Sequence, residues 1–184
     1  PQDSTEAADT STPQACLDGA RDILSERWAE APAVVAPMRE WLWQTGHLIS
    51  QLRAGKEQEG AKFRDYFDYA EPLDKVPSHR ALAVLRGRAQ EVLDARIDLP
   101  PMPEGTAAPT LAALAEGRLA VLLGWSHQGR AADDWLRRAI QWTWKVKLSL
   151  TLERELLSRL REKSEAVAID VFGANLRDLL LAAP

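Results

Sequence analysis

The sequence predicts a mainly α-helical chain: an irregular array of helices with one long C-terminal helix or helix pair, and at most a small two-stranded sheet. Two observations favour helices. Apolar residues recur at helical spacing through most of the chain, and no Pro or Gly interrupts residues 131–171. A third observation limits the sheet, because strict apolar–polar alternation is confined to residues 93–99.

The first helix is expected after a polar N-terminal stretch. Residues 1–14 are rich in Ser, Thr, Asp, Glu, Ala and Pro and have no apolar period, so we expect disorder or a linker there. From Leu17, apolar residues recur every three or four positions as far as Trp28. This spacing predicts an amphipathic helix that ends before Pro32.

A second helix is predicted to carry Met38, Trp41 and Leu42 and to end at Gly46. Pro37 would clash with the preceding turn if this helix began at Pro32. We therefore expect the helix to begin near Pro37 or to be kinked there.

Residues 62–87 are predicted to form a unit of helix, rigid polar turn and helix, similar to a helix-turn-helix. Phe63, Tyr66 and Phe67 are spaced to share one helical face, where we expect them to pack in the core against the helix of Leu82 and Leu85. An exposed stacking platform is the alternative for these rings. Pro72 is expected to stop the first helix.

The second helix of this unit has a start signal and a stop signal. Ser78 follows Pro77 and can cap the helix through its hydroxyl, and Gly87 can supply the left-handed residue that ends it.

The alternating stretch is predicted to be a half-buried strand, with Leu93, Ala95, Ile97 and Leu99 on one side. A lone strand would leave its backbone groups unpaired, so it needs a partner. The expected partner is residues 47–52, which could otherwise form a short helix.

The C-terminal half begins after a Pro-rich linker or surface loop. We expect a helical subdomain over residues 15–100 and another over residues 110–184. The second contains a helix that ends at Gly124 and a loop to Gly129. The long helix or helix pair then opens with Asp133 and Asp134, which suit the positive end of the helix dipole.

The composition is that of a soluble globular protein, with 46% apolar and 27% charged residues. A net charge of −4 gives no electrostatic case for nucleic-acid binding by the whole chain, so any such contact must be local. The single cysteine, Cys16, excludes an internal disulfide, and no apolar run approaches the length of a bilayer span. We therefore expect a cytoplasmic protein.

Few side chains are arranged in a pattern typical of a catalytic or metal-binding site. His47, His79 and His127 are scattered, so we predict no metal site, and backbone hydrogen bonding is the simplest role for His79. The acidic side chains in residues 65–74 are expected to form a solvent-exposed face of the aromatic helix and to cap turns. No nucleophile or phosphate loop accompanies them, so we predict no catalytic residue, no cofactor and no enzyme activity.

Two groups of basic residues could contact phosphate. The first, Lys75, Arg80, Arg86 and Arg88, has the better claim because it lies along the second helix of the helix-turn-helix-like unit. The second comprises Arg137, Arg138, Lys145 and Lys147. For both groups a solvated helix face is the alternative interpretation.

Several segments carry a family resemblance. They are Gly19-Ala-Arg-Asp-Ile-Leu-Ser-Glu-Arg, Phe63-Arg-Asp-Tyr-Phe-Asp-Tyr, Pro77-Ser-His-Arg-Ala-Leu-Ala, Arg86-Gly-Arg with Glu91-Val-Leu, and Asn175-Leu-Arg-Asp-Leu-Leu-Leu-Ala-Ala-Pro. In this order they resemble the hallmark run of the Tex family of bacterial transcription accessory proteins. A proline at position 37 departs from the usual pattern of the family.

The resemblance implies an internal helical region of a longer chain. In that family an RNase H-like domain follows the last motif, then helix-hairpin-helix elements and an S1 domain that binds RNA or DNA. The implied function is a non-catalytic helical scaffold that binds nucleic acid through those other domains and offers a surface to the transcription machinery. The alternative is a nucleic-acid-binding module that uses the Arg80, Arg86 and Arg88 face.

The end of the chain is expected to need a covering partner. Apolar residues crowd positions 169–181 and would cover more than one face of a helix. The resemblance implies that the RNase H-like domain of the same chain packs on this helix. Without that domain, we expect an exposed apolar patch, fraying or self-association.

Overall fold

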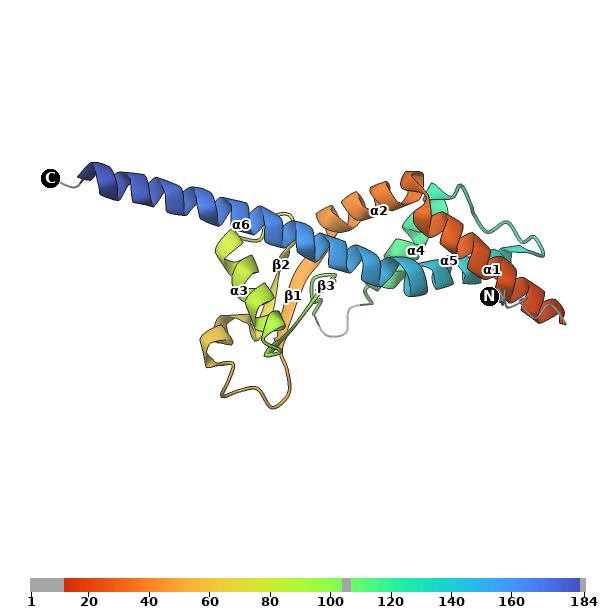
Figure 1. The fold of residues 1–184 in the computed structure, drawn as a ribbon. Helices are drawn as coiled ribbons and strands as arrows, with labels where there is room; N and C mark the ends of the chain where they lie inside the picture. The colour runs from red at the N-terminus through yellow and green to blue at the C-terminus, as the bar shows by residue number, and fades with distance from the viewer. Residues whose placement is uncertain (1–11, 104–106, 183–184) are drawn as a thin grey trace, which may run out of the picture. The chain divides into compact units, whose positions relative to one another are not determined.

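The mainly α class and the long C-terminal helix are confirmed by a computed structural model, which describes residues 12–103 and 107–182 (Figure 1). Contacts divide the chain into two compact units. Unit 1 combines Pro1–Met38 with Ala112–Leu150, and unit 2 combines Arg39–Leu111 with Thr151–Pro184. Each unit therefore joins segments from both halves of the chain, a different division from the consecutive subdomains expected at residues 15–100 and 110–184.

Helix α1 (Pro13–Glu30) begins earlier than the apolar period alone indicates. The Thr12 hydroxyl accepts a hydrogen bond from the Ala15 N–H at 3.1 Å, and Pro13 occupies the first turn, where its missing N–H has no cost. The helix ends before Pro32 as predicted. Residues 1–11, the main part of the expected linker, lie outside the described residues.

Helix α2 (Pro32–Thr45) corrects the expected start near Pro37, which lies inside the helix. Pro32 is itself well suited to a first helical position, since its fixed φ angle matches the helix. Pro37 lacks the N–H that would donate to the Ala33 carbonyl, so the helix loses one backbone hydrogen bond there. Full burial of Met38 and Leu42 offsets this local loss.

The sheet of unit 2 has three antiparallel strands in the order β2-β1-β3, one more than expected. The predicted pairing of β1 (His47–Leu52) with β3 (Leu93–Asp98) is confirmed, and Leu48 lies opposite Ile97. The additional strand is β2 (Asp68–Pro72), which pairs with the other edge of β1. Pro72 ends this edge strand opposite His47, at a position where a missing N–H can be tolerated.

The predicted aromatic α-helix is wrong. Residues Ala61–Tyr66 form the 3₁₀ segment η1, and Phe63 has non-helical backbone angles of φ −110° and ψ 16°. Phe63 is nevertheless buried and clusters with Val92 and Leu93, while Tyr66 and Phe67 are partly buried against that cluster. Phe63 is therefore in the core as predicted, but its cluster contains Val92 and Leu93 and not the expected Leu82 and Leu85. A tight turn places the rings there, because the chain must enter β2 directly afterwards.

Helix α3 (Ser78–Ala89) starts where predicted, but Ser78 does not cap it. Pro77 is the N-cap residue, and no side chain caps this helix end. Ser78 is already the first helical residue, so its hydroxyl is past the position that reaches the orphan N–H groups.

Gly87 does not end α3 either. The left-handed residue is Glu91 (φ 57°), after which the Val92 N–H donates to the Gly87 carbonyl at 3.0 Å and the Glu91 N–H donates to the Arg88 carbonyl at 3.0 Å. These two bonds form a Schellman motif. Gly87 lies inside the helix. A larger residue would not fit at this position, because a Cβ there would come within 2.5 Å of Leu93 Cδ1.

Unit 1 is completed by α4 (Leu111–Leu122), α5 (Asp133–Trp142) and the π-helical segment η2 (Thr143–Leu148). As predicted, α4 ends just before Gly124, which is left-handed (φ 64°). The Thr143 hydroxyl donates to the Ala139 carbonyl at 2.8 Å and lies 2.9 Å from the Ser25 hydroxyl, with both side chains fully buried. This pair joins α1 to η2.

Helix α6 (Ser149–Ala182) follows η2 without a break, so the predicted long helix is confirmed. In unit 2 it is held by reciprocal ion pairs with α2, Arg39 to Glu155 at 2.8 Å and Arg159 to Glu40 at 3.1 Å. The Arg159 guanidinium, which also lies 4.1 Å above the Trp43 ring, lowers the pKa of Glu40. Among the described residues, no helix combines the length and apolarity needed to cross a bilayer.

Candidate functional site

The first predicted basic group is only partly brought together by the fold. Lys75 lies in the turn between β2 and α3, and Arg80, Arg86 and Arg88 lie along α3. At about 100° per residue, Arg86 is rotated about 120° from Arg80 and about 160° from Arg88 around the helix axis. The three arginines therefore do not share a single face of α3.

Carboxylates of the same unit engage two of these cations. Arg80 pairs with Glu71 of β2 at 2.5 Å, which raises the pKa of Arg80, and Arg88 pairs with Glu153 of α6 at 3.6 Å. Lys75 and Arg86 are exposed, and no carboxylate of the described residues lies within 4.0 Å of either.

The histidines do not converge. His79 is exposed at the start of α3, and His127 lies 3.4 Å from Asp134 in unit 1. Within residues 12–103 and 107–182, no three His, Cys, Asp or Glu side chains are placed to hold a metal ion.

The second basic group is divided by ion pairing. Arg137 pairs with Asp134, and Lys147 lies 3.8 Å from Glu26 of α1. Arg138 and Lys145 are exposed and have no such partner in the described part of the chain. Both line a pocket instead.

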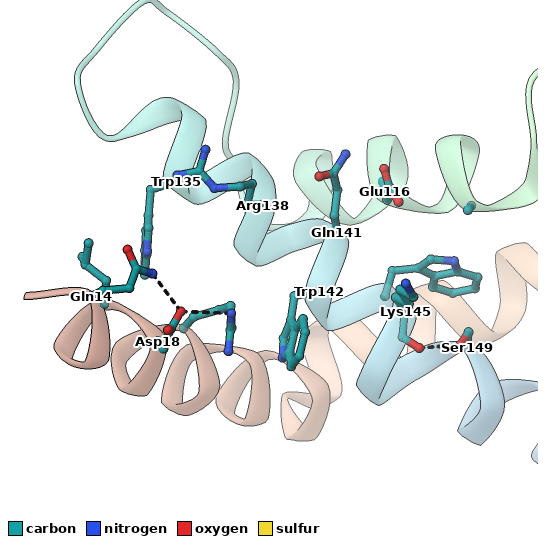
Figure 2. Close-up of a pocket in the computed structure, with 13 residues that line it drawn as sticks. Gln14, Asp18, Glu116, Trp135, Arg138, Gln141, Trp142, Lys145 and Ser149 are labelled. Atoms are coloured by element: carbon teal, nitrogen blue, oxygen red, sulfur yellow. Dashed lines mark hydrogen bonds and ion pairs between the residues drawn. The ribbon is translucent and has the colours of Figure 1, made fainter. Parts of the chain in front are cut away.

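This pocket, of about 720 Å³, lies within unit 1 and is shown in Figure 2. Its lining combines three indole rings with polar and charged side chains from α1, α4, α5 and η2, ending at the start of α6. The lining residues are Gln14, Leu17, Asp18, Arg21, Ala112, Glu116, Trp135, Arg138, Gln141, Trp142, Trp144, Lys145 and Ser149.

Sequence reasoning missed the tryptophans of this pocket although a signal was present. Trp135 and Trp142 are seven residues apart, as are Arg138 and Lys145. Seven residues make nearly two helical turns, so aromatic and cationic side chains alternate along one side of the helix. Trp135 and Trp142 also have the helical spacing of residues that pack in a core. Tryptophans with this spacing are usually interpreted as core residues and not as part of a binding site.

A buried carboxylate organises the loop before α5. Asp133 is fully buried and accepts hydrogen bonds from the Gln128 N–H at 2.8 Å and the Arg130 N–H at 2.9 Å. Its other oxygen accepts from the Trp125 indole at 3.2 Å and the Arg130 guanidinium at 2.8 Å. The Arg130 guanidinium, followed by the backbone donors, holds the pKa of Asp133 well below its usual range, although burial acts in the opposite direction.

The C-terminal part of α6 exposes the apolar surface expected there. Ser164 is the last buried residue of the helix, and every described residue after it is exposed. Figure 1 shows this dark-blue end of α6 extending beyond the rest of unit 2. The exposed large apolar residues of this segment are Val167, Ile169, Val171, Phe172, Leu176, Leu179, Leu180 and Leu181.

Comparison with known proteins decides the family. Residues 3–172 match the family model described as Tex central region-like. The chain belongs to the Tex family. The resemblance carried by the short sequence motifs is thereby confirmed.

Curated members of the Tex family are much longer than this chain. It is 50% identical over 177 residues to protein tex of Bordetella pertussis and 47% identical over 171 residues to protein YhgF of Escherichia coli. It is 43% identical over 171 residues to the transcriptional accessory protein Tex of Neisseria gonorrhoeae. Each match covers 93% of this chain and 22% of the relative, so the chain spans about a fifth of the length of these relatives.

Proposed function

We propose that this chain is a non-catalytic helical scaffold region of a Tex-like transcription accessory protein. It acts in the cytoplasm, a compartment that suits a chain with one cysteine. It holds other domains of the longer protein in place and offers a surface to the transcription machinery, while nucleic acid is bound by domains outside this region. The name of the Neisseria gonorrhoeae relative and the match to a central-region model support this role.

The observation that carries the proposal is the exposed apolar end of α6. A surface of this kind on a soluble protein marks a site where another domain or protein packs. Leu176 and Leu180 are one turn apart and are 46% and 69% exposed. We propose that the RNase H-like domain implied by the family resemblance packs on this part of the helix.

Substituting this apolar end should change how the chain associates. We expect the unmodified chain to self-associate at high protein concentration, because contact between copies removes the apolar side chains from water. A Leu176→Gln/Leu180→Gln variant should remain monomeric. Static light scattering over a concentration series measures the difference.

A matched control is available in unit 1, where Ile23 and Val121 are 70% and 69% exposed. The Ile23→Gln/Val121→Gln variant should associate like the unmodified chain. A monomeric unmodified chain with slow hydrogen exchange throughout residues 165–182 would show that the apolar face is already satisfied, and would contradict the proposed docking role.

Nucleic-acid binding by unit 2 is a second candidate function, favoured by the exposed cations Lys75 and Arg86, which have no ion-pair partner among the described residues. If this function is correct, replacing Lys75 and Arg86 by Ala should weaken binding to duplex and single-stranded nucleic acid and reduce its salt dependence. Replacing Arg137 and Lys147 by Ala, which removes two paired cations from unit 1, is the control. Titrations at several salt concentrations test this, and an absence of binding at low salt would reject the second function.

A further inference from the structure

The pocket of unit 1 is not explained by a scaffold role. Its wall along α5 and η2 presents Trp135 and Trp142 together with Arg138 and Lys145. Figure 2 shows Trp135, Arg138 and Gln141 on α5, with Trp142 and Lys145 further along the same continuous helix. Aromatic and cationic side chains therefore reach one cavity from one wall.

The two cations are available for an anionic ligand. Neighbouring Arg137 and Lys147 are already engaged by Asp134 and Glu26. Arg138 and Lys145 are exposed, and no carboxylate in the described part of the chain lies within 4.0 Å of them. Because charge-assisted hydrogen bonds to phosphate are among the strong polar contacts, each of these two side chains suits a phosphate group.

The rings differ in how they are covered. The Arg21 guanidinium lies 3.9 Å from the Trp142 ring centroid and is itself paired with Asp18 and Asp22. Trp135 is half-buried, and among the described residues it has no aromatic or cation–π contact. Trp144, the third ring of the lining, is 5% exposed, so Trp135 is the partly exposed indole of the pocket that has no such contact in the described part of the chain.

The lining also contains groups that can hydrogen-bond the edge of a planar ligand. Glu116 of α4 is half-buried in the lining and has no ion-pair partner among the described residues, and the Gln141 amide lines the same pocket. A carboxylate accepts hydrogen bonds from exocyclic amines of nucleobases, and an amide can both donate and accept.

We propose that this pocket binds a nucleotide unit, with its base stacked on Trp135 and its phosphate held by Arg138, while Lys145, further along the helix, can contact a neighbouring phosphate of a strand. Glu116 and Gln141 line the pocket further from Trp135 and can hydrogen-bond a base edge there. The volume of about 720 Å³ is in the range of small-ligand sites. The same chemistry is offered by a free nucleotide and by one nucleotide of a single strand, since a base face and an adjacent phosphate are common to both.

Calorimetric titration with adenosine monophosphate and with a single-stranded DNA hexanucleotide tests the proposal on the whole chain. We expect saturable binding of at least one probe at low salt. Trp135→Ala should weaken it about five- to a hundredfold, the range expected for loss of one stacked base. Trp135→Phe retains an aromatic ring and should restore most of the affinity.

The phosphate contacts are tested by a matched pair of double variants. Arg138→Ala/Lys145→Ala should weaken binding and reduce its salt dependence, whereas Arg137→Ala/Lys147→Ala should have little effect. Equal affinity for both probes identifies a free nucleotide as the ligand, and much tighter hexanucleotide binding identifies a single strand. Absence of binding by both probes, or equal losses in the two double variants, would overturn the proposal. These binding measurements concern the pocket of unit 1, so their outcome is separate from the test of self-association through α6.

Discussion

Replacing Phe63 by Ala is expected to lower the free energy of unfolding by about 3–5 kcal/mol, the usual cost of truncating a buried aromatic ring. Phe63 is 4% exposed and packs with Val92 and Leu93, which are 3% and 0% exposed. Removing the ring would therefore leave a cavity beside the end of α3 and the start of β3. Urea denaturation followed by circular dichroism measures the change.

Phe67→Ala provides the matched control for Phe63→Ala. Phe67 belongs to the same aromatic group but is only partly buried against the Phe63 cluster. We expect a clearly smaller loss of stability, because less apolar surface returns to water on unfolding. Equal losses for the two variants would show that the rings contribute alike and would contradict the observed division between core and periphery.

The pairing of β1 with β3 could be predicted because two independent constraints agree. Alternation in residues 93–98 indicates one buried face, and a strand without a partner has unpaired backbone groups. The long C-terminal helix could also be predicted, since neither Pro nor Gly interrupts residues 131–171. These features depend on local patterns that tertiary contacts do not override.

The aromatic segment could not be assigned from spacing alone. Phe63, Tyr66 and Phe67 have the spacing of a helical face, but backbone pairing of Asp68–Pro72 with β1 determines the conformation. This pairing joins residues about twenty positions apart, and no local propensity reports it. The end of α3 was misassigned for a related reason, because close packing with Leu93 explains Gly87 better than a left-handed backbone does.

The candidate sites show the same dependence on distant contacts. Four basic residues around α3 look alike in the sequence, yet Glu71 and Glu153 engage two of them and leave two exposed. In the second group, pairing again separates Arg137 and Lys147 from the two cations of the pocket. Sequence can identify cations, but only the folded chain shows which of them keep their charge available to a ligand.

Asp133→Asn is expected to destabilise unit 1 more than any exposed polar substitution in it. The uncharged amide is nearly the same size, but its NH₂ group cannot accept hydrogen bonds from the donors that now surround the carboxylate. The N–H groups of Gln128 and Arg130 or the Trp125 indole would lose partners, and the Arg130 guanidinium would lose its counter-charge. Thermal unfolding at neutral pH measures the loss.

The pH dependence of this contribution has a definite sign. The pKa of Asp133 is depressed in the folded chain, so its stabilising effect is fully present above the unfolded pKa of about 3.9 and is lost as pH falls toward the folded value. The difference in melting temperature between the unmodified chain and Asp133→Asn should therefore be constant near neutral pH and shrink below about pH 4. Asp134→Asn is the control, since Asp134 occupies the same first turn of α5 with its side chain 62% exposed, and it should change stability little. A difference between Asp133→Asn and the unmodified chain that persisted unchanged at the lowest accessible pH would show that shape, and not the ionised carboxylate, organises the loop before α5.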